Sequence, residues 1–187
     1  GSIPLRGHVC ALEGWRIGTY AWNGSYKRGG VILRERRTMT PQTLNSTAEV
    51  AGHPIHPMLV PIPIVCFIGA LITDITYFVT AEMMWADFSA WLLVVGFIFG
   101  LLAAIAGLID FFSNRLIRAQ LPAWPHLLGN IVVLILAFFN VLIHTRDAWT
   151  SVVPAGMILS IVTVLILPVT GWLGWALVYR HRVGVSP

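Results

Sequence analysis

The sequence predicts an all-α membrane protein, an antiparallel up-down bundle of four transmembrane helices with both termini in the cytoplasm. Of the 187 residues, 57% are hydrophobic and only 11% are charged, whereas a soluble domain carries about 25% charged residues. Four long apolar segments follow one another, each long enough to cross ~30 Å of hydrocarbon as a helix. Because lipid offers the backbone no hydrogen-bond partners, such segments are expected to be helical.

The predicted helices are separated by short connections. The helices are expected at about residues 57–79, 88–112, 124–144 and 152–179. Because the connections between them are too short to cross the bundle, consecutive helices should be antiparallel neighbours. Residues 52–187 are therefore expected to form one four-helix transmembrane domain.

Residues 1–51 precede this domain and are expected to be a disordered N-terminal tail. The stretch 1–38 is rich in Gly, Arg and aromatic residues, has no regular hydrophobic period and lacks the apolar core of a signal peptide. Two interpretations stay open. Residues 1–38 are either a tag, scar or over-extended reading frame before a natural start at Met39, or a short, disordered basic tail.

Prolines in the sequence HPIHP at 53–57 set the expected start of the first helix. A proline disfavours helical geometry at the residue before it, here His53 and His56. Proline is itself tolerated at the first helical position. We therefore expect an extended or tightly turned segment, followed by a helix that starts near Pro57.

Basic residues set the expected orientation and partners. The net charge is +4, but Lys and Arg lie in the tail and at the ends of apolar segments. This distribution predicts contact with a lipid bilayer and no nucleic-acid partner. The end that holds both termini carries the larger share of the arginines, among them Arg115, Arg118, Arg180 and Arg182, whereas Arg146 lies at the other end. The positive-inside rule therefore predicts cytoplasmic termini.

Histidines gather at this predicted cytoplasmic end. His53 and His56 open the first helix, Asp110 closes the second, His126 opens the third and His181 follows the fourth. Imidazole and carboxylate suit Zn, Fe, Cu or Ni, and facing helices of bundles often hold metals or cofactors. The cluster predicts a site for haem b or a transition metal. The alternative is a structural cluster in which Asp110 is hydrogen-bonded to a histidine.

A second polar pattern runs along the third helix. His126, Asn130, Asn140 and His144 share one of its faces at helical spacing. Asp74, near the far end of the first helix, is expected at the depth of Asn140 and His144. Ionisable groups inside membrane segments are costly and therefore raise a functional question. The pattern predicts either a proton or substrate path, or hydrogen bonds between helices that contribute ~0.6–2 kcal/mol each.

Small residues form a stripe on the second helix, at Gly96, Gly100, Ala103 and Gly107. Small residues let helix backbones approach closely in membranes. The stripe therefore predicts a helix-packing face rather than a chemical site.

Several of these motifs occur together in a known family. They are GHPIHPMLVPIPI at 52–64, Asp74, GLID at 107–110, His126 with Asn130, and GWLGWALVYRHRVGV at 171–185. Over roughly 50–185 the chain resembles the bacterial membrane proteins of domain of unknown function 2231. The resemblance implies a four-helix, multi-pass inner-membrane protein without an assigned activity, and relatives joined to Rieske or cytochrome c domains imply redox work. Trp175 and Ala176 depart from the Gly-Glu expected there.

Three functions are compatible with the sequence. The first is a redox protein with a metal or haem at the His/Asp cluster. The second is a small transporter or proton-conducting bundle that uses the polar face. The third is a structural or assembly subunit that packs on partners through Gly96 and Gly100. A redox protein or a second copy of the chain is the expected partner. No GxSxG, HExxH or P-loop pattern favours an enzyme.

Overall fold

The structure is a computed structural model that describes residues 22–28, 31–37, 46–146 and 148–184. The chain divides into two units, Gly1–Gln42 and Thr43–Pro187. In the first unit, β1 (Trp22–Arg28) and β2 (Val31–Arg37) pair as an antiparallel hairpin. This differs from the disordered tail expected there. The Gly29-Gly30 dipeptide between the strands is a typical hairpin-turn sequence. Met39 lies outside the described residues.

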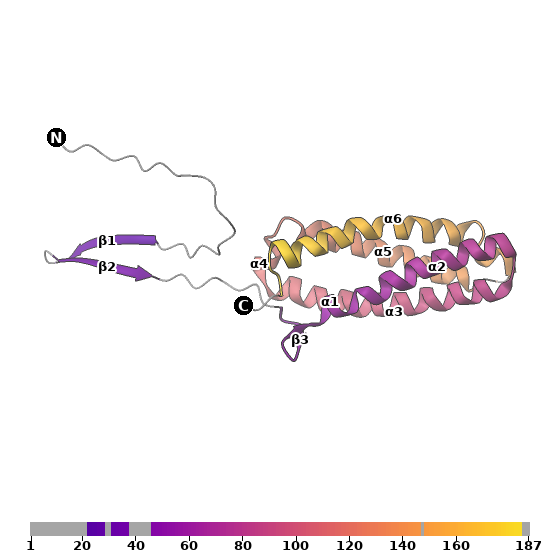
Figure 1. Ribbon diagram of the computed structural model, residues 1–187, viewed down its shortest axis with the longest axis horizontal. Coiled ribbons are helices and arrows are strands. Elements are labelled where there is room, and N and C mark those ends of the chain that lie inside the picture. Colours follow the sequence, from indigo (N-terminus) through magenta and orange to yellow (C-terminus); the bar gives the residue numbers. More distant parts are fainter. Residues whose placement is uncertain (1–21, 29–30, 38–45, 147, 185–187) are drawn as a thin grey trace, which may run out of the picture. The chain divides into compact units, whose positions relative to one another are not determined.

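The second unit contains four helices long and apolar enough to cross a membrane (Figure 1). They span Ile55–Thr80, Met83–Ser113, Ala123–His144 and Ala155–Arg180. The predicted fold class, a four-helix membrane protein, is therefore confirmed. We call the end that holds Ile55 and Arg180 the cavity end, and the end that holds Thr80 and His144 the far end.

The first span begins earlier than predicted. A short pair of strands, β3 (Glu49–Val50) and β4 (His53–Pro54), leads directly into α1 (Ile55–Leu59) and, after Val60, α2 (Pro61–Thr80). His53 is extended, as its proline neighbour favours, but His56 is helical despite Pro57. The His56 ring is hydrogen-bonded to a carbonyl of the next helix, and this tertiary contact outweighs a local steric preference.

The remaining spans also differ from the predicted bounds at their ends. α3 (Met83–Ser113) begins before Phe88, because only Ala81 and Glu82 separate it from α2. A short helix, α4 (Arg115–Arg118), leads to α5 (Ala123–His144). A 3₁₀ turn, η1 (Ala148–Ser151), precedes α6 (Ala155–Trp175), which ends in a π-helical turn, η2 (Ala176–Arg180).

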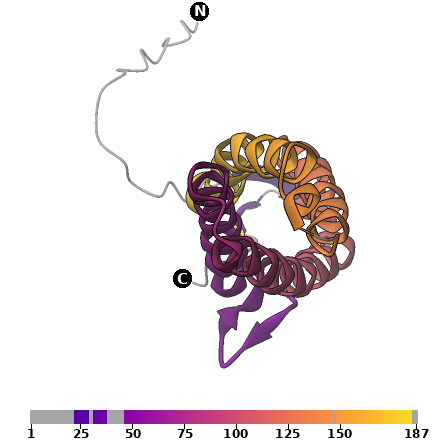
Figure 2. The same cartoon turned by 90° about the vertical axis from the view of Figure 1, so that its right-hand side faces the viewer.

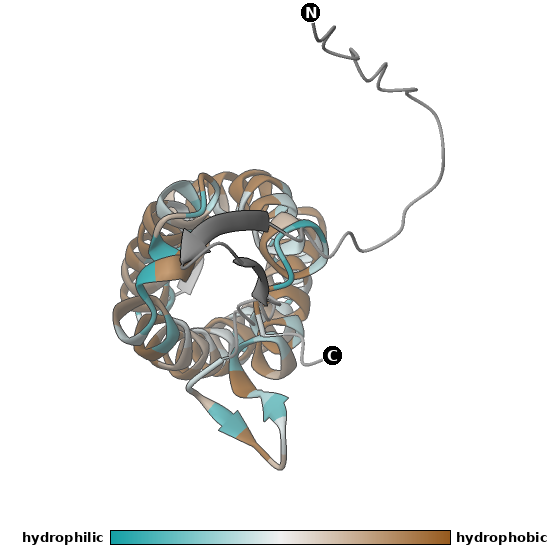
Figure 3. Cartoon of the chain, turned by 90° about the vertical axis from the view of Figure 1, so that its left-hand side faces the viewer, coloured by the Kyte–Doolittle hydropathy of each residue, from teal (hydrophilic) through white to brown (hydrophobic). Residues whose placement is uncertain are grey.

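The four spans form a closed ring, visible along the bundle in Figure 2. α2 packs on α3, α3 on α5, α5 on α6, and α6 on α2. Apolar side chains fill the middle of the ring, with a core formed by Phe67, Ala70, Leu93, Val133, Ala137 and Leu167. Large apolar side chains such as Val65 and Leu165 are also exposed on the outside, and most of the helical ribbon is hydrophobic in Figure 3. An apolar outer surface of this kind suits contact with lipid.

The glycine stripe of α3 faces other helices of the same chain. A Cβ atom on Gly96 would lie 2.8 Å from Phe67 Cε1 and 2.9 Å from Cys66 Cβ. One on Gly100 would lie 3.0 Å from Leu134 Cδ2, and one on Gly107 would lie 3.0 Å from a His56 ring atom. The stripe therefore packs inside the ring, and the structure does not offer these glycines to a partner protein.

Gly96→Ala should destabilise the bundle by about 1–3 kcal/mol, because the added methyl group overpacks the contact between α2 and α3. Gly171→Ala is the matched control, since a Cβ atom on this α6 glycine meets nothing within 4 Å. It should be neutral, or stabilising by up to ~1 kcal/mol. Denaturant unfolding in micelles, followed by circular dichroism, measures both. Equal effects at the two positions would contradict the packing described here.

Candidate functional site

A cavity of about 340 Å³ lies at the cavity end of the bundle and is bordered by residues of all four spans. Its walls are mostly apolar, and His56 and His126 are the histidines that line it. Concave, apolar sites with a few placed polar groups are the usual form of cofactor and ligand sites. This cavity is therefore the candidate site of the described part of the chain.

His56 is oriented by α3. Its Nδ1 lies 2.7 Å from the carbonyl oxygen of Ala103. Since a carbonyl only accepts hydrogen bonds, Nδ1 carries a proton, and in the neutral ring the lone pair is on Nε2. No described residue is hydrogen-bonded to this Nε2. Gly107 gives the ring its room, because a Cβ atom there would lie 3.0 Å from Nδ1.

His126 is oriented in the same way by α6. Its Nδ1 lies 2.9 Å from the carbonyl oxygen of Thr170 and donates to it. The amide nitrogen of Asn130 lies 3.3 Å from both ring nitrogens and donates at 2.7 Å to the His126 carbonyl. Gly174 makes room for the ring, since a Cβ atom there would lie 2.8 Å from Cε1.

The two histidines are thus oriented in the same way, although Asn130 Nδ2 lies 3.3 Å from Nε2 of His126 alone. Each ring packs on a glycine of the neighbouring helix, and each Nδ1 donates to the carbonyl four residues before that glycine. The ring centres of His56 and His126 are 5.9 Å apart, and the ring planes are nearly perpendicular, at 88°. The arrangement fixes both tautomers with the Nδ1 proton in place and leaves both Nε2 atoms as the basic nitrogens.

Two members of the predicted His/Asp cluster, His53 and His181, do not line the cavity. His53 is exposed in β4, and His181 follows η2, where its backbone amide caps the helix on Ala176. Among the described residues, no group of three His, Cys, Asp or Glu side chains is placed to hold a metal ion. The five predicted residues therefore do not form one metal-binding group. His56, His126 and Asp110 all line the cavity, and His56 and His126 have their rings side by side.

Asp110 has a different use from the one expected. Its Oδ1 accepts hydrogen bonds from the backbone amides of Thr47 at 2.7 Å and Ala48 at 2.9 Å. Its Oδ2 accepts one from the Ser46 hydroxyl at 2.7 Å. The carboxylate thus holds the segment before β3 against the end of α3. Ser46 itself borders the cavity. Sequence reasoning missed this contact, because two of its three donors are backbone amides.

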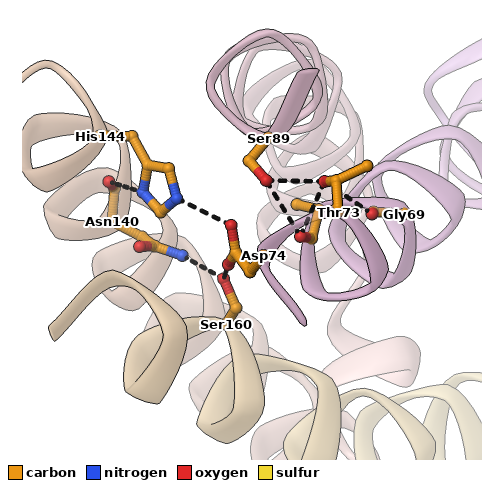
Figure 4. A network of polar contacts seen from close by, with 8 residues as sticks. Gly69, Thr73, Asp74, Ser89, Asn140, His144 and Ser160 are labelled. Atoms are coloured by element: carbon orange, nitrogen blue, oxygen red, sulfur yellow. Dashed lines mark hydrogen bonds and ion pairs between the residues drawn. The ribbon is translucent and has the colours of Figure 1, made fainter. Parts of the chain in front are cut away.

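A second polar group, the far-end network, joins α2, α5 and α6 near the far end (Figure 4). His144 Nε2 lies 3.0 Å from Asp74 Oδ1, and the Ser160 hydroxyl donates to Asp74 Oδ2 at 2.5 Å. Asn140 Nδ2 donates to Ser160 at 2.8 Å. Asp74 and Asn140 are fully buried, and the His144 side chain is 1% exposed. The structure thus brings together Asp74, Asn140 and His144, and adds Ser160, which sequence reasoning missed.

The hydrogen bonds of the far-end network determine which of its atoms carry protons. His144 Nδ1 lies 3.0 Å from the carbonyl oxygen of Asn140, so Nδ1 is protonated. A proton must also lie between Nε2 and Asp74 Oδ1, since two bare acceptors would repel at 3.0 Å. Whichever atom carries it, the pair of Asp74 and His144 is neutral overall. A neighbouring hydroxyl pair, Thr73 and Ser89 at 2.6 Å, joins α2 to α3 beside it.

Comparison with known proteins identifies the family. Residues 52–187 match the family described as "Predicted membrane protein (DUF2231)". The chain belongs to this family. The resemblance drawn from the sequence motifs is therefore confirmed. No curated protein and no solved structure matches the chain. The DUF2231 region includes the His56/His126 pair and the far-end network, whereas the Ser46–Ala48 segment lies just before it.

In this DUF2231 protein, Asp110→Ala should release the segment before β3. Amide hydrogen exchange at Thr47 and Ala48 should accelerate roughly ten- to a hundredfold, since hydrogen bonds to a charged group contribute ~1.5–3 kcal/mol each. Asp87→Ala is the control, because Asp87 is exposed on α3. Exchange followed by mass spectrometry measures both variants. Unchanged exchange in Asp110→Ala would show that other contacts hold the segment.

Proposed function

We propose that this membrane protein binds a redox-active metal centre between Nε2 of His56 and Nε2 of His126. The observation that carries the proposal is the matched orientation of the two rings. Histidines that bind metals usually donate their other ring nitrogen to a carbonyl or carboxylate, which fixes the tautomer. Both histidines meet this condition, through Ala103 and Thr170, and both line one cavity.

The spacing of the rings supports a shared metal. Two Nε2 atoms that each lie about 2.0 Å from one ion place the ring centres about 6 Å apart when they bind from opposite sides. The observed separation of the ring centres is 5.9 Å. The glycines at 107 and 174 support the same conclusion, since any larger residue would push a ring from its place.

The ligand set favours haem b over a bare ion. Structural ions such as zinc need about four protein ligands. Among the described residues no third His, Cys, Asp or Glu is placed to hold an ion together with the pair, and the Asp110 carboxylate is already bonded to the Ser46–Ala48 segment. Two imidazoles instead suit a metal that brings its own equatorial ligands. Bound haem would supply one-electron chemistry, and protein ligands on both axial sides favour electron transfer over oxygen binding. The walls of the cavity are mostly apolar, and the segment held by Asp110 borders it at Ser46.

The proposed setting is a bacterial inner membrane with the cavity end facing the cytoplasm. Arg115, Arg118, Arg180 and Arg182 belong to the cavity end, whereas Arg146 follows α5 at the far end. This bias supports cytoplasmic termini. A redox protein that docks at the cavity end, nearest the histidine pair, is the proposed partner.

Reporter fusions should reveal this orientation. A fluorescent reporter that folds only in the cytoplasm should be bright when fused after residue 184, and a phosphatase that is active only outside should be inactive there. The same reporters placed in the turn at Ala81–Glu82 should show the reverse, since that turn lies at the far end. Active phosphatase at the C-terminal position would contradict the orientation.

Haem reconstitution tests the function directly. Purified protein in detergent should bind added hemin with one-to-one stoichiometry and give the spectrum of low-spin iron with two imidazole ligands. His56→Ala and His126→Ala should each lose that spectrum, because either change removes one axial ligand. His53→Ala is the matched control, since His53 is exposed in β4, and it should bind hemin as the unmodified chain does.

Elemental analysis of the same preparations separates haem from other metals. A stoichiometric metal that disappears in both His56→Ala and His126→Ala would support the histidine pair as the site but replace haem by a different complex. Protein that neither binds hemin nor retains any metal would contradict the proposal.

A further inference from the structure

We propose that the bundle also conducts protons between its two ends, along the inner seam between α5 and α6. The far-end network is the proton-binding station of this path, and the cavity is its opening on the other side. The proposal does not depend on a bound metal, because every group that it uses belongs to the chain.

The far-end network contains the groups that such a station needs. Asp74 of α2 and His144 of α5 are its titratable members, and α6 contributes the hydroxyl of Ser160. Intramembrane carboxylate and histidine pairs are costly to bury and often mark proton relays. The single proton between His144 Nε2 and Asp74 Oδ1 is therefore the transferable one.

Two buried oxygen atoms without hydrogen-bond partners indicate that the seam has more than a structural role. Among the described residues, Asn140 Oδ1 and Thr163 Oγ1 are the buried side-chain atoms without a hydrogen-bond partner. The Ser160 hydroxyl donates its one proton to Asp74, so it can only accept a hydrogen bond from Asn140. Asn140 therefore directs its Nδ2 to Ser160, and its Oδ1 points away from Ser160. Buried polar atoms are usually paired. These two oxygens are suited to bind water molecules that pass through the seam.

Thr163 differs from the other threonines that line the bundle. Thr73 and Thr170 each bond to carbonyls of their own helix, which satisfies a hydroxyl inside an apolar helix. Thr163 makes no such bond, although it is 2% exposed. Its hydroxyl is therefore available both to donate and to accept, as a proton relay requires.

The cavity reaches to within one helical turn of Thr163. Its floor is formed by Phe67, Val133 and Leu167. Leu167 lies four residues after Thr163 on α6, about 6 Å along the axis. Ser160 lies three residues before Thr163, on the same buried face. A single apolar layer therefore separates the cavity from the polar seam, and this layer is the barrier to water.

Each transfer moves one proton and restores the starting state. A proton that arrives by water forms a new O–H bond at Ser160 Oγ, while the hydroxyl's own proton moves to Asp74 Oδ2. The Asp74–His144 pair then holds two protons and one positive charge. His144, the last residue of α5, releases its Nε2 proton to water at the far end. The pair is left neutral, with its one proton on Asp74 Oδ2. Rotation of the carboxyl group then returns this proton to the position between the carboxyl group and His144 Nε2, and the Ser160 hydroxyl turns its new proton to Asp74, which restores the starting hydrogen bonds. A proton gradient or membrane potential drives the net movement.

Proton flux into liposomes tests the path. The full chain, without added metal or haem, is reconstituted with an internal pH-sensitive dye, and a potassium gradient with valinomycin imposes the potential. The unmodified chain should exceed the flux of empty vesicles, and Asp74→Asn should return it to that background. Thr163→Val, which keeps the shape but removes the hydroxyl, should lower the flux about tenfold, as for one lost hydrogen bond.

Three further variants make the outcome specific. Thr163→Ser should retain the flux, because it keeps the hydroxyl. Thr76→Val should leave it unchanged, since Thr76 bonds to the Ile72 carbonyl of its own helix. Leu167→Ala should raise it by thinning the apolar barrier. Flux equal to that of empty vesicles for the unmodified chain, or full flux in Asp74→Asn, would overturn the proposal. Neither outcome bears on the hemin titration, so the two proposals fail independently.

Discussion

The structure depends on one constraint, which is that polar groups inside an apolar bundle must find their partners within the chain. Several described side chains meet it by hydrogen bonds from one helix to another. His56 links α1 to α3, and His126 links α5 to α6. Asp74 links α2 to both α5 and α6. These bonds fix the register of the ring in a way that apolar packing alone does not, since lipid and core are equally apolar.

The same bonds relate the two halves of the bundle. Asp74 follows His56 by 18 residues, and His144 follows His126 by the same interval, so each half carries a polar residue at both ends of one helical face. At the cavity end the equivalent residues are both histidines with basic Nε2 atoms. At the far end they are an acid and a base, which neutralise each other at 3.0 Å. One repeated framework thus produces two chemically different sites.

Hydropathy alone was enough to predict the four spans, because the length and composition of each are set by the membrane. The depth match between Asp74 and His144 was also predictable from helical spacing. The structure shows no metal-binding group among the five residues predicted at the cavity end, since topology places residues at an end without fixing where their side chains point. The Asp110 carboxylate accepts hydrogen bonds from the backbone amides of Thr47 and Ala48. In the sequence, Ser160 and Thr163 look like ordinary hydroxyl residues of an apolar helix. Only the structure shows that Ser160 donates to Asp74 and that Thr163 has no hydrogen-bond partner among the described residues.

The two ends suit different chemistry because their histidine and aspartate side chains differ in how many of their nitrogen and oxygen atoms are already hydrogen-bonded. At the cavity end, Nδ1 of each histidine is occupied, Nε2 is the basic atom and a cavity is present, so an external group finds ligands already oriented. At the far end, both nitrogens of His144 and both oxygens of Asp74 are hydrogen-bonded, so no ligand larger than a proton is accommodated without breaking the network. The Thr163 hydroxyl, which has no hydrogen-bond partner among the described residues, lies between the cavity and the far-end network. In the proposed path the position of Thr163, rather than the His56/His126 pair or the Asp74–His144 pair, therefore decides whether the ends act separately or as one path.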